Sequence, residues 1–189
     1  MTLTVLTLFL LALALLAGLL VLVPDTVEYV EETVVEAPAG AVFDAIRVQA
    51  DLMRWSAWPS ETRSDCAVAG PDGQVGARTV FTSGGQPFGH QEVTRLDEGR
   101  MVEFTLTSKG PPHWPTLRFH LVPLSPTRTR VLLDFRNRYA RPFHVLVRVM
   151  GIVRWTREMH RRDLAGLKRF VEPPHLTYTG EAVPAPRAA

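Results

Sequence analysis

Residues 101–136 read MVEFTLTSKGPPHWPTLRFHLVPLSPTRTRVLLDFR, and this stretch decides the fold. Apolar side chains recur at every second position in successive runs, and turn sequences at 110–112 and 125–126 separate these runs. The positions that carry the alternation are Val102, Phe104, Leu106, Leu117, Phe119, Leu121, Val131, Leu133 and Phe135. A period of two indicates strands with one buried face, and short turns favour antiparallel pairing. The stretch therefore predicts consecutive strands of an antiparallel sheet.

More strands are expected upstream of this stretch. Turn sequences rich in Gly, Pro and Asp recur at 71–73, 84–85 and 97–99, and strand-like segments lie between them. Together with the strands above, these segments predict a seven-stranded antiparallel sheet that has one apolar and one solvated face. The expected upstream strands cover residues 63–69, 75–83 and 89–96 and, before the first helix, 27–36.

Helices are expected on both sides of the strands. Residues 39–47 and 51–55 predict two short helices before most of the sheet. Residues 143–171 contain no internal Pro and predict one C-terminal helix about 43 Å long. Its apolar stripe is formed by Leu146, Val149, Val153, Leu164, Leu167 and Val171. A sheet and a helix that each have an apolar side bury these sides against one another, so the fold class is α+β.

The N-terminal segment from Thr2 to Val23 carries no charge and is dominated by Leu, Ala and Val. As a helix it would be about 33 Å long, which matches the hydrocarbon thickness of a bilayer. A cleaved signal peptide typically has a basic residue before a shorter apolar run and small residues at its end. This run is long, nothing basic precedes it, and it ends in Leu-Val-Leu-Val-Pro. We therefore expect an uncleaved, single-pass transmembrane helix.

The flank of this helix suggests an orientation. Acidic residues begin at Asp25, and the first basic residue is Arg47. Because Lys and Arg mark the cytoplasmic side of a membrane helix, their absence here favours an extracytoplasmic location for the domain that follows.

The overall composition excludes several classes of protein. The 189 residues are 46% hydrophobic, which is enough for one domain with a sizeable core. A single Cys excludes a disulfide framework, and the six His show no metal-ligand spacing, so no metal or cofactor is expected. The net charge of +2 gives no reason to expect a nucleic-acid partner. Residues 173–189 are rich in Pro and Ala and are expected to be a disordered tail.

Three motifs resemble one known superfamily. Residues 32–46, ETVVEAPAGAVFDAI, resemble its opening strand, Ala-Pro corner and first helix. Residues 51–59, DLMRWSAWP, are similar to its Trp pair leading into Pro, and residues 164–172, LAGLKRFVE, resemble the end of its C-terminal helix. In this order, the motifs make residues 27–172 similar to the SRPBCC superfamily, the START-like and birch-pollen-allergen-like proteins, and within it to the polyketide cyclase/dehydrase and lipid-transport branch.

The resemblance implies a helix-grip fold, in which a curved sheet and the long C-terminal helix enclose a cavity for a hydrophobic or amphipathic ligand. It does not imply catalysis, because this superfamily contains carriers, sensors and enzymes. One possible function is a membrane-anchored binding module for lipid transfer or sensing. The alternative is an enzyme of the polyketide cyclase/dehydrase type that uses polar groups in the same cavity. A third is an interaction domain whose interior is filled by its own side chains.

The candidate ligand-binding residues are the large apolar side chains on the inward faces and the polar groups among them. Asn137 continues the inward track of the last strand, and Thr156 and His160 interrupt the apolar stripe of the long helix. The whole set is Trp55, Trp58, Phe81, Phe104, Phe119, Leu133, Phe135, Asn137, Val153, Thr156 and His160.

Catalytic residues are harder to identify, and none is assigned. Low-ranking candidates are His160 and the pair His90 and Glu92, which would provide an acid and a base if their face of the strand were buried. The commoner explanation for His160 is a histidine satisfied within the core rim. The sequence does not show which face of the strand around His90 is buried.

Charge is distributed unevenly along the chain. Acidic residues dominate 25–72 and basic residues dominate 136–169. If the first and last strands pair, the acidic and basic residues of these strands face each other, which is ordinary cross-strand complementarity. The expected partners are Glu28, Glu31, Glu32 and Glu36 on one strand and Arg128, Arg130, Arg136 and Arg138 on the other. Residues 143–155 are apolar apart from His144, Arg148 and Arg154, and a helix of this kind could rest on an anionic bilayer.

Overall fold

The structure, a computed structural model, describes residues 2–172. The predicted disordered tail at 173–189 lies outside the described residues. Seven antiparallel strands form one sheet in the order β1-β7-β6-β5-β4-β3-β2, so β1 and β2 are its edge strands. This confirms the predicted sheet. The strands are β1 (Thr26–Val35), β2 (Asp65–Ala69), β3 (Arg78–Ser83), β4 (Gln86–Asp97), β5 (Met101–Ser108), β6 (His113–Ser125) and β7 (Arg128–Tyr139).

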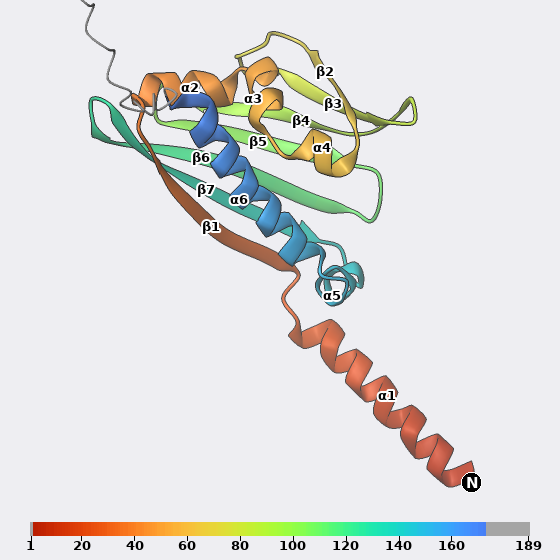
Figure 1. The fold of residues 1–189 in the computed structure, drawn as a ribbon. Coiled ribbons are helices and arrows are strands. Elements are labelled where there is room, and N and C mark those ends of the chain that lie inside the picture. The colour runs from red at the N-terminus through yellow and green to blue at the C-terminus, as the bar shows by residue number, and fades with distance from the viewer. Residues whose placement is uncertain (1, 173–189) are drawn as a thin grey trace, which may run out of the picture.

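Helices cover one face of the curved sheet (Figure 1). The longest, α6, crosses this face diagonally near β1 and contacts the short helices α2 and α3 at its C-terminal end and α5 at its N-terminal end. This is the predicted helix-grip arrangement. The helices are α1 (Thr2–Leu22), α2 (Ala39–Arg47), α3 (Gln49–Trp55), α4 (Trp58–Thr62), α5 (Phe143–Val149) and α6 (Ile152–Val171).

The main hydrophobic core lies where α2, α3 and the second half of α6 meet the middle of the sheet. Phe43 and Ile46 from α2 and Leu167 from α6 are almost completely buried there against inward residues of the strands. The ring of Trp55 packs edge-on against Phe119, and its Nε1 donates to the carbonyl of Ala45 at 2.9 Å. This core fills one half of the space between helices and sheet.

Gly166 allows α6 to pack closely on this core. A Cβ atom at this position would lie 2.1 Å from the carbonyl oxygen of Trp55. No real side chain has room there, so the backbones of α6 and of the end of α3 approach as closely as only glycine permits.

The predicted single helix over residues 143–171 is wrong, because the chain forms two helices there. Gly151 has a φ of 72°, which ends α5 and re-aims the chain into α6. As a result, Leu146 and Val149 are exposed rather than part of a stripe against the sheet. The short helix α4 was also not predicted; it begins at Trp58 with Pro in its first turn.

The predicted charge pairing between the edge strand and β7 is correct in part. Glu28 pairs with Arg136 and Glu36 with Arg128, each at 3.0 Å. Glu31 instead lies on the inward face of β1, where it pairs with arginines of α6. The prediction missed this because alternation along β1 places Glu31 on the same face as Val27, Tyr29 and Val35. The α6 partners of Glu31 are Arg157 and Arg161.

Helix α1 projects away from the sheet at the end where β1 begins (Figure 1). Its residues 3–22 are long and apolar enough to cross a membrane, and they do not pack against the domain. The guanidinium of Arg141 donates to the carbonyl of Leu20 at 2.8 Å, so the chain between β7 and α5 meets the end of α1.

Candidate functional site

A cavity of about 390 Å³ lies between the first half of α6 and the end of the sheet opposite the main core. Because α6 crosses the sheet diagonally, it leaves the ends of β4 to β7 uncovered on one side (Figure 1). The cavity wall is mostly apolar and comes from α4, α5, α6 and the inward residues of these strands. The large apolar residues that line it are Trp58, Phe81, Phe88, Leu106, Phe135, Tyr139, Val147, Ile152 and Trp155.

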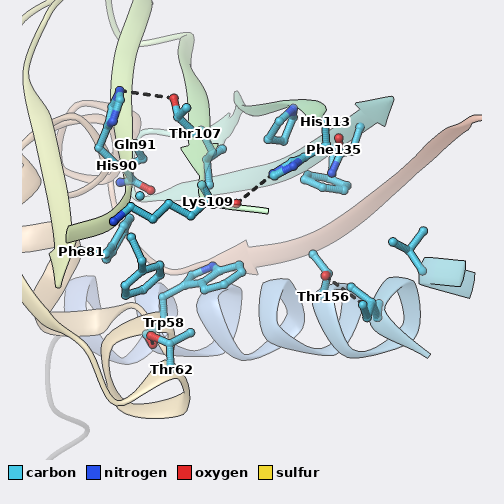
Figure 2. Close-up of a pocket in the computed structure, with 18 of the residues that line it drawn as sticks. Trp58, Thr62, Phe81, His90, Gln91, Thr107, Lys109, His113, Phe135 and Thr156 are labelled. Carbon is cyan, nitrogen blue, oxygen red and sulfur yellow. Dashed lines mark hydrogen bonds between the residues drawn. The ribbon is translucent and has the colours of Figure 1, made fainter. Parts of the chain in front are cut away.

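Figure 2 shows how side chains from distant parts of the chain surround this space. Trp58 and Thr62 come from α4, Thr156 comes from α6, and Phe135 comes from β7 on the opposite side. Ring contacts stabilise the wall on the α4 side, where Trp58 and Trp155 meet edge to face with centroids 5.5 Å apart.

Gly89 explains how β4 and β5 can form the floor of the cavity. A Cβ atom at Gly89 would lie 2.4 Å from the carbonyl oxygen of Thr107 on β5. The strands therefore approach more closely here than any other residue would permit, and the ladder between β3 and β4 shifts register directly beyond this point. Phe88 and Gln91 flank this irregularity, and both line the cavity.

His160 lines the cavity and is hydrogen-bonded to Tyr29 behind it. The Tyr29 hydroxyl and His160 Nδ1 share a hydrogen bond of 2.9 Å, and the imidazole packs against the ring of Phe135 with centroids 4.8 Å apart. Burial lowers the pKa of His160 to about 4, and the carboxylate of Glu31 offsets this only in part. Burial also raises the pKa of the Tyr29 hydroxyl. Both groups are therefore neutral at pH 7.

Asn137 places an unused acceptor in the wall. Its side chain is 4% exposed, and Oδ1 has no hydrogen-bond partner within residues 2–172. A buried acceptor without a partner costs free energy, so such atoms usually have a ligand or water nearby. Asn137 lines the cavity, and a ligand that donates a hydrogen bond would remove this cost.

Asp163 holds α4 and its Trp58 in place. The carboxylate oxygen Oδ1 accepts the backbone N–H of Ala57 at 2.7 Å and the hydroxyl of Ser56 at 3.1 Å. These bonds fix the link between α3 and α4 on the surface of α6. Burial raises the pKa of the Asp163 carboxyl to about 7, although both hydrogen bonds act in the opposite direction. The carboxyl therefore sits at the border between its neutral and charged forms near neutral pH.

Six of the predicted ligand-binding residues line this cavity, and the structure brings them together from four elements. They are Trp58, Phe81, Phe135, Asn137, Thr156 and His160. Thr156 uses its hydroxyl to donate to the carbonyl of Ile152 at 2.9 Å, as threonines inside helices often do. Contact of these residues with a ligand stays a prediction.

Five other predicted residues lie elsewhere. Trp55, Phe104, Phe119 and Leu133 belong to the main hydrophobic core, because they sit on the stretch of the sheet that α2 and α3 cover. Val153 packs on the outer side of the cavity wall, beside Val27, Tyr139 and Val147. Alternation along a strand predicted correctly that Phe104, Phe119 and Leu133 point inward, but not whether they meet helix or empty space.

His90 and Glu92 do not form an acid–base pair in the cavity. Gln91 and Val93 are the buried residues of β4, so His90 and Glu92 belong to the opposite face. Glu92 pairs with Arg78 at 2.8 Å. His90 lies at the cavity rim, where its Nε2 meets the hydroxyl of Thr107 at 3.3 Å (Figure 2).

Sequence reasoning missed several residues in the wall or directly behind it. Tyr29 lies on an edge strand 131 residues before His160, and nothing in its local pattern predicts the contact. Lys109 directly follows β5 and lines the cavity. It carries the only permanent positive charge among the lining residues that the structure describes. Trp155 directly precedes the predicted Thr156, and the helical spacing that selected Thr156 excluded it.

Comparisons with known proteins relate the chain to others of this fold. The family model described as "Polyketide cyclase / dehydrase and lipid transport" matches residues 26–172. No curated protein matches the chain. Norcoclaurine synthase from Thalictrum flavum is similar in structure, with a TM-score of 0.58, 13% identity and coverage of 79% of this chain and 88% of that one.

Two bacterial proteins of known structure are also similar. Protein CV1439 from Chromobacterium violaceum has a TM-score of 0.56 and 20% identity, over 79% of this chain and 98% of its own. A protein from Nitrosospira multiformis has a TM-score of 0.57 and 21% identity, over 77% of this chain and 96% of its own. At these identities the likeness concerns the fold.

Proposed function

Because the chain belongs to the polyketide cyclase/dehydrase and lipid transport family, we propose that its cavity binds a hydrophobic or lipid-like small molecule and that α1 anchors the binding domain to a membrane. The observation that carries this proposal is the cavity of about 390 Å³, whose wall is apolar apart from a few polar groups. Cavities of this composition and size are typical of sites for small apolar ligands. Transfer of the ligand to or from the bilayer, or sensing of it, would use the same site.

The polar groups of the wall favour a ligand with a neutral, hydrogen-bonding end. Asn137 offers a free acceptor, and the pair of Tyr29 and His160 is uncharged at pH 7. Lys109, which directly follows β5, is the only permanently charged cation among the described lining residues. An ionised carboxylate can only accept hydrogen bonds, so a hydroxyl or amide fits beside the acceptor Oδ1 of Asn137 better than an ionised acid.

The direct test is to identify what the protein carries. We expect native mass spectrometry of the full chain, released from nanodiscs, to show a bound apolar compound. A Thr156→Trp variant fills the cavity and should lose the adduct at least tenfold. Thr127→Trp, in the exposed turn between β6 and β7, is the matched control and should keep it. An adduct that survives in Thr156→Trp would refute binding in this cavity.

Asn137 provides a second test, of the polar end of the ligand. With 1-dodecanol as the probe, Asn137→Leu should weaken binding about 2- to 10-fold, because one buried hydrogen bond contributes roughly 0.5–1.5 kcal/mol. Binding of n-dodecane, which has no hydroxyl, should be unchanged or tighter. Competition against a fluorescent apolar probe measures both. Equal losses for the two compounds would mean that Asn137 does not contact the polar end.

The second candidate function is catalysis of the polyketide cyclase/dehydrase type. The observation that favours it is His160 in the cavity wall, hydrogen-bonded to Tyr29 behind it, since a neutral imidazole can accept or pass on a proton. A binding module would return its extracted ligand chemically unchanged after incubation. An enzyme would convert it, and Tyr29→Phe or His160→Gln would slow this conversion more than binding.

A further inference from the structure

We propose that the corner formed by α5 and Gly151 inserts into the bilayer surface beside α1 and opens the cavity directly onto the lipid. This inference rests on the proposed membrane anchor and ligand site. It assigns a partner, the lipid leaflet that α1 enters, to a surface that the domain itself leaves uncovered. The surface, called the α5 corner below, consists of Leu146, Val149 and Met150.

The α5 corner is apolar on its outer side. Leu146 is 49% exposed, Val149 is 78% exposed and Met150 is 64% exposed, and the three lie within five consecutive residues. The inner side of the same short helix carries His144 and Val147, which are buried against the domain. The inner side is already packed, so the apolar outer side stays in water unless an apolar partner outside the domain covers it.

Chain connectivity holds this corner at the membrane. Helix α1 ends at Leu22, and β1 starts at Thr26, so the start of β1 is at most about 14 Å from the end of α1. Thr26 pairs with Arg138 near the end of β7, and α5 begins at Phe143 directly afterwards. Figure 1 shows α5 at the same end of the sheet as α1. The corner thus lies at the end of the domain that is tethered to α1.

Charge favours a lipid surface over a neutral apolar partner. Arg141, Arg148 and Arg154 surround the corner, and within the described residues none of them pairs with a carboxylate. Arg141 and Arg148 donate to backbone carbonyls instead. Farther along α6, Arg157 and Arg162 are neutralised by Glu31 and Glu61. Near α1, these three arginines therefore leave positive charge without a carboxylate partner, and this charge would meet anionic headgroups.

The α5 corner adjoins the cavity wall. Val147 of α5 and Ile152 and Trp155 of α6 line the cavity, while their neighbours Val149 and Met150 face outward. A ligand that passes beside this corner would move between acyl chains and the cavity without crossing water. Tethering by α1 makes this contact intramolecular, so a few exposed apolar residues suffice for it.

Spin labels on the full chain test the contact. Cys66→Ser removes the only cysteine, and a nitroxide is then placed by Met150→Cys in one sample and by Leu124→Cys in another. Leu124 is also exposed, at 43%, but it lies at the end of β6 that is farther from α5. In nanodiscs with phosphatidylglycerol, the ratio of oxygen collisions to collisions with a water-soluble nickel chelate is measured for each label. This ratio should be at least tenfold higher for the Met150 label than for the Leu124 label.

Three outcomes overturn or support the inference. Equal access of nickel to both labels would place the corner in water and refute it. A Met150 label protected from both oxygen and nickel would show a protein partner and also refute it. The expected oxygen preference should weaken severalfold in Arg154→Glu and in nanodiscs of phosphatidylcholine alone, but not in Arg169→Glu at the far end of α6. Ligand carried by the same samples reports separately on the proposed function.

Discussion

Gly166→Ala is expected to destabilise the domain by about 3 kcal/mol, although alanine is the better helix former. The new Cβ would lie 2.1 Å from the carbonyl oxygen of Trp55 and 3.2 Å from its carbonyl carbon. Both atoms belong to the backbone, so no rotamer change relieves the overlap, and α6 must move away from α3. Thermal unfolding of the full chain, followed by circular dichroism, measures the loss.

Gly40→Ala is the matched control. Gly40 lies in α2 with ordinary helical geometry, and a Cβ there meets nothing within 4 Å. The substitution should stabilise the domain by about 0.5–1 kcal/mol, the usual gain from Gly to Ala in a helix. If Gly166→Ala behaved like Gly40→Ala, the close approach of α6 and α3 would be wrong.

The wild-type domain is expected to become less stable as the pH rises, and the Asp163→Asn variant should not show this loss of stability. Burial raises the pKa of Asp163 from 3.8 to about 7 in the folded domain. Between these values the folded state holds a proton that the unfolded state has released, so stability falls with rising pH. At pH 8 the variant should be more stable than the wild type by a few kcal/mol, and at pH 4 the two should be nearly equal.

His160 has the opposite effect over an overlapping range. Its pKa falls from 6.5 to about 4 on folding, so the unfolded state binds the extra proton and stability rises with pH between about 4 and 6.5. The two residues therefore offset each other in the wild type. Denaturant titrations from pH 4 to 8 should show rising stability in Asp163→Asn up to about pH 6.5 and falling stability in His160→Gln. Parallel curves for the variants would contradict both assignments.

Most of the fold could be predicted from the sequence. Alternation in residues 101–136 predicted the central strands, and the motifs at 32–46, 51–59 and 164–172 predicted the family that the match confirms. The break at Gly151 was missed because the apolar spacing continues through it, and a single Gly is tolerated within many helices. Only the backbone shows that this Gly has a positive φ.

The candidate site was less predictable than the fold. Period-two alternation shows which face of the sheet a side chain occupies, and it placed Phe104 and Phe135 on the same inward face. It contains no information on where helices cross that face, so it could not show that Phe135 lines the cavity as well as belonging to the core, whereas Phe104 belongs to the core alone. The contact of Tyr29 with His160 likewise depends on the angle of α6 over β1, which is set by tertiary packing.

The pairing of β1 with β7 also has a consequence for biosynthesis. The first strand emerges right behind α1, yet its neighbour in the sheet is the last strand, and Lys168 of α6 donates to the carbonyl of Val34 from 134 residues later. Until the ribosome has made nearly the whole chain, β1 has an unpaired edge. Folds closed by such distant contacts form slowly, and exposed strands attract other chains. We therefore expect the nascent chain to depend on chaperones that shield β1 until translation is almost complete.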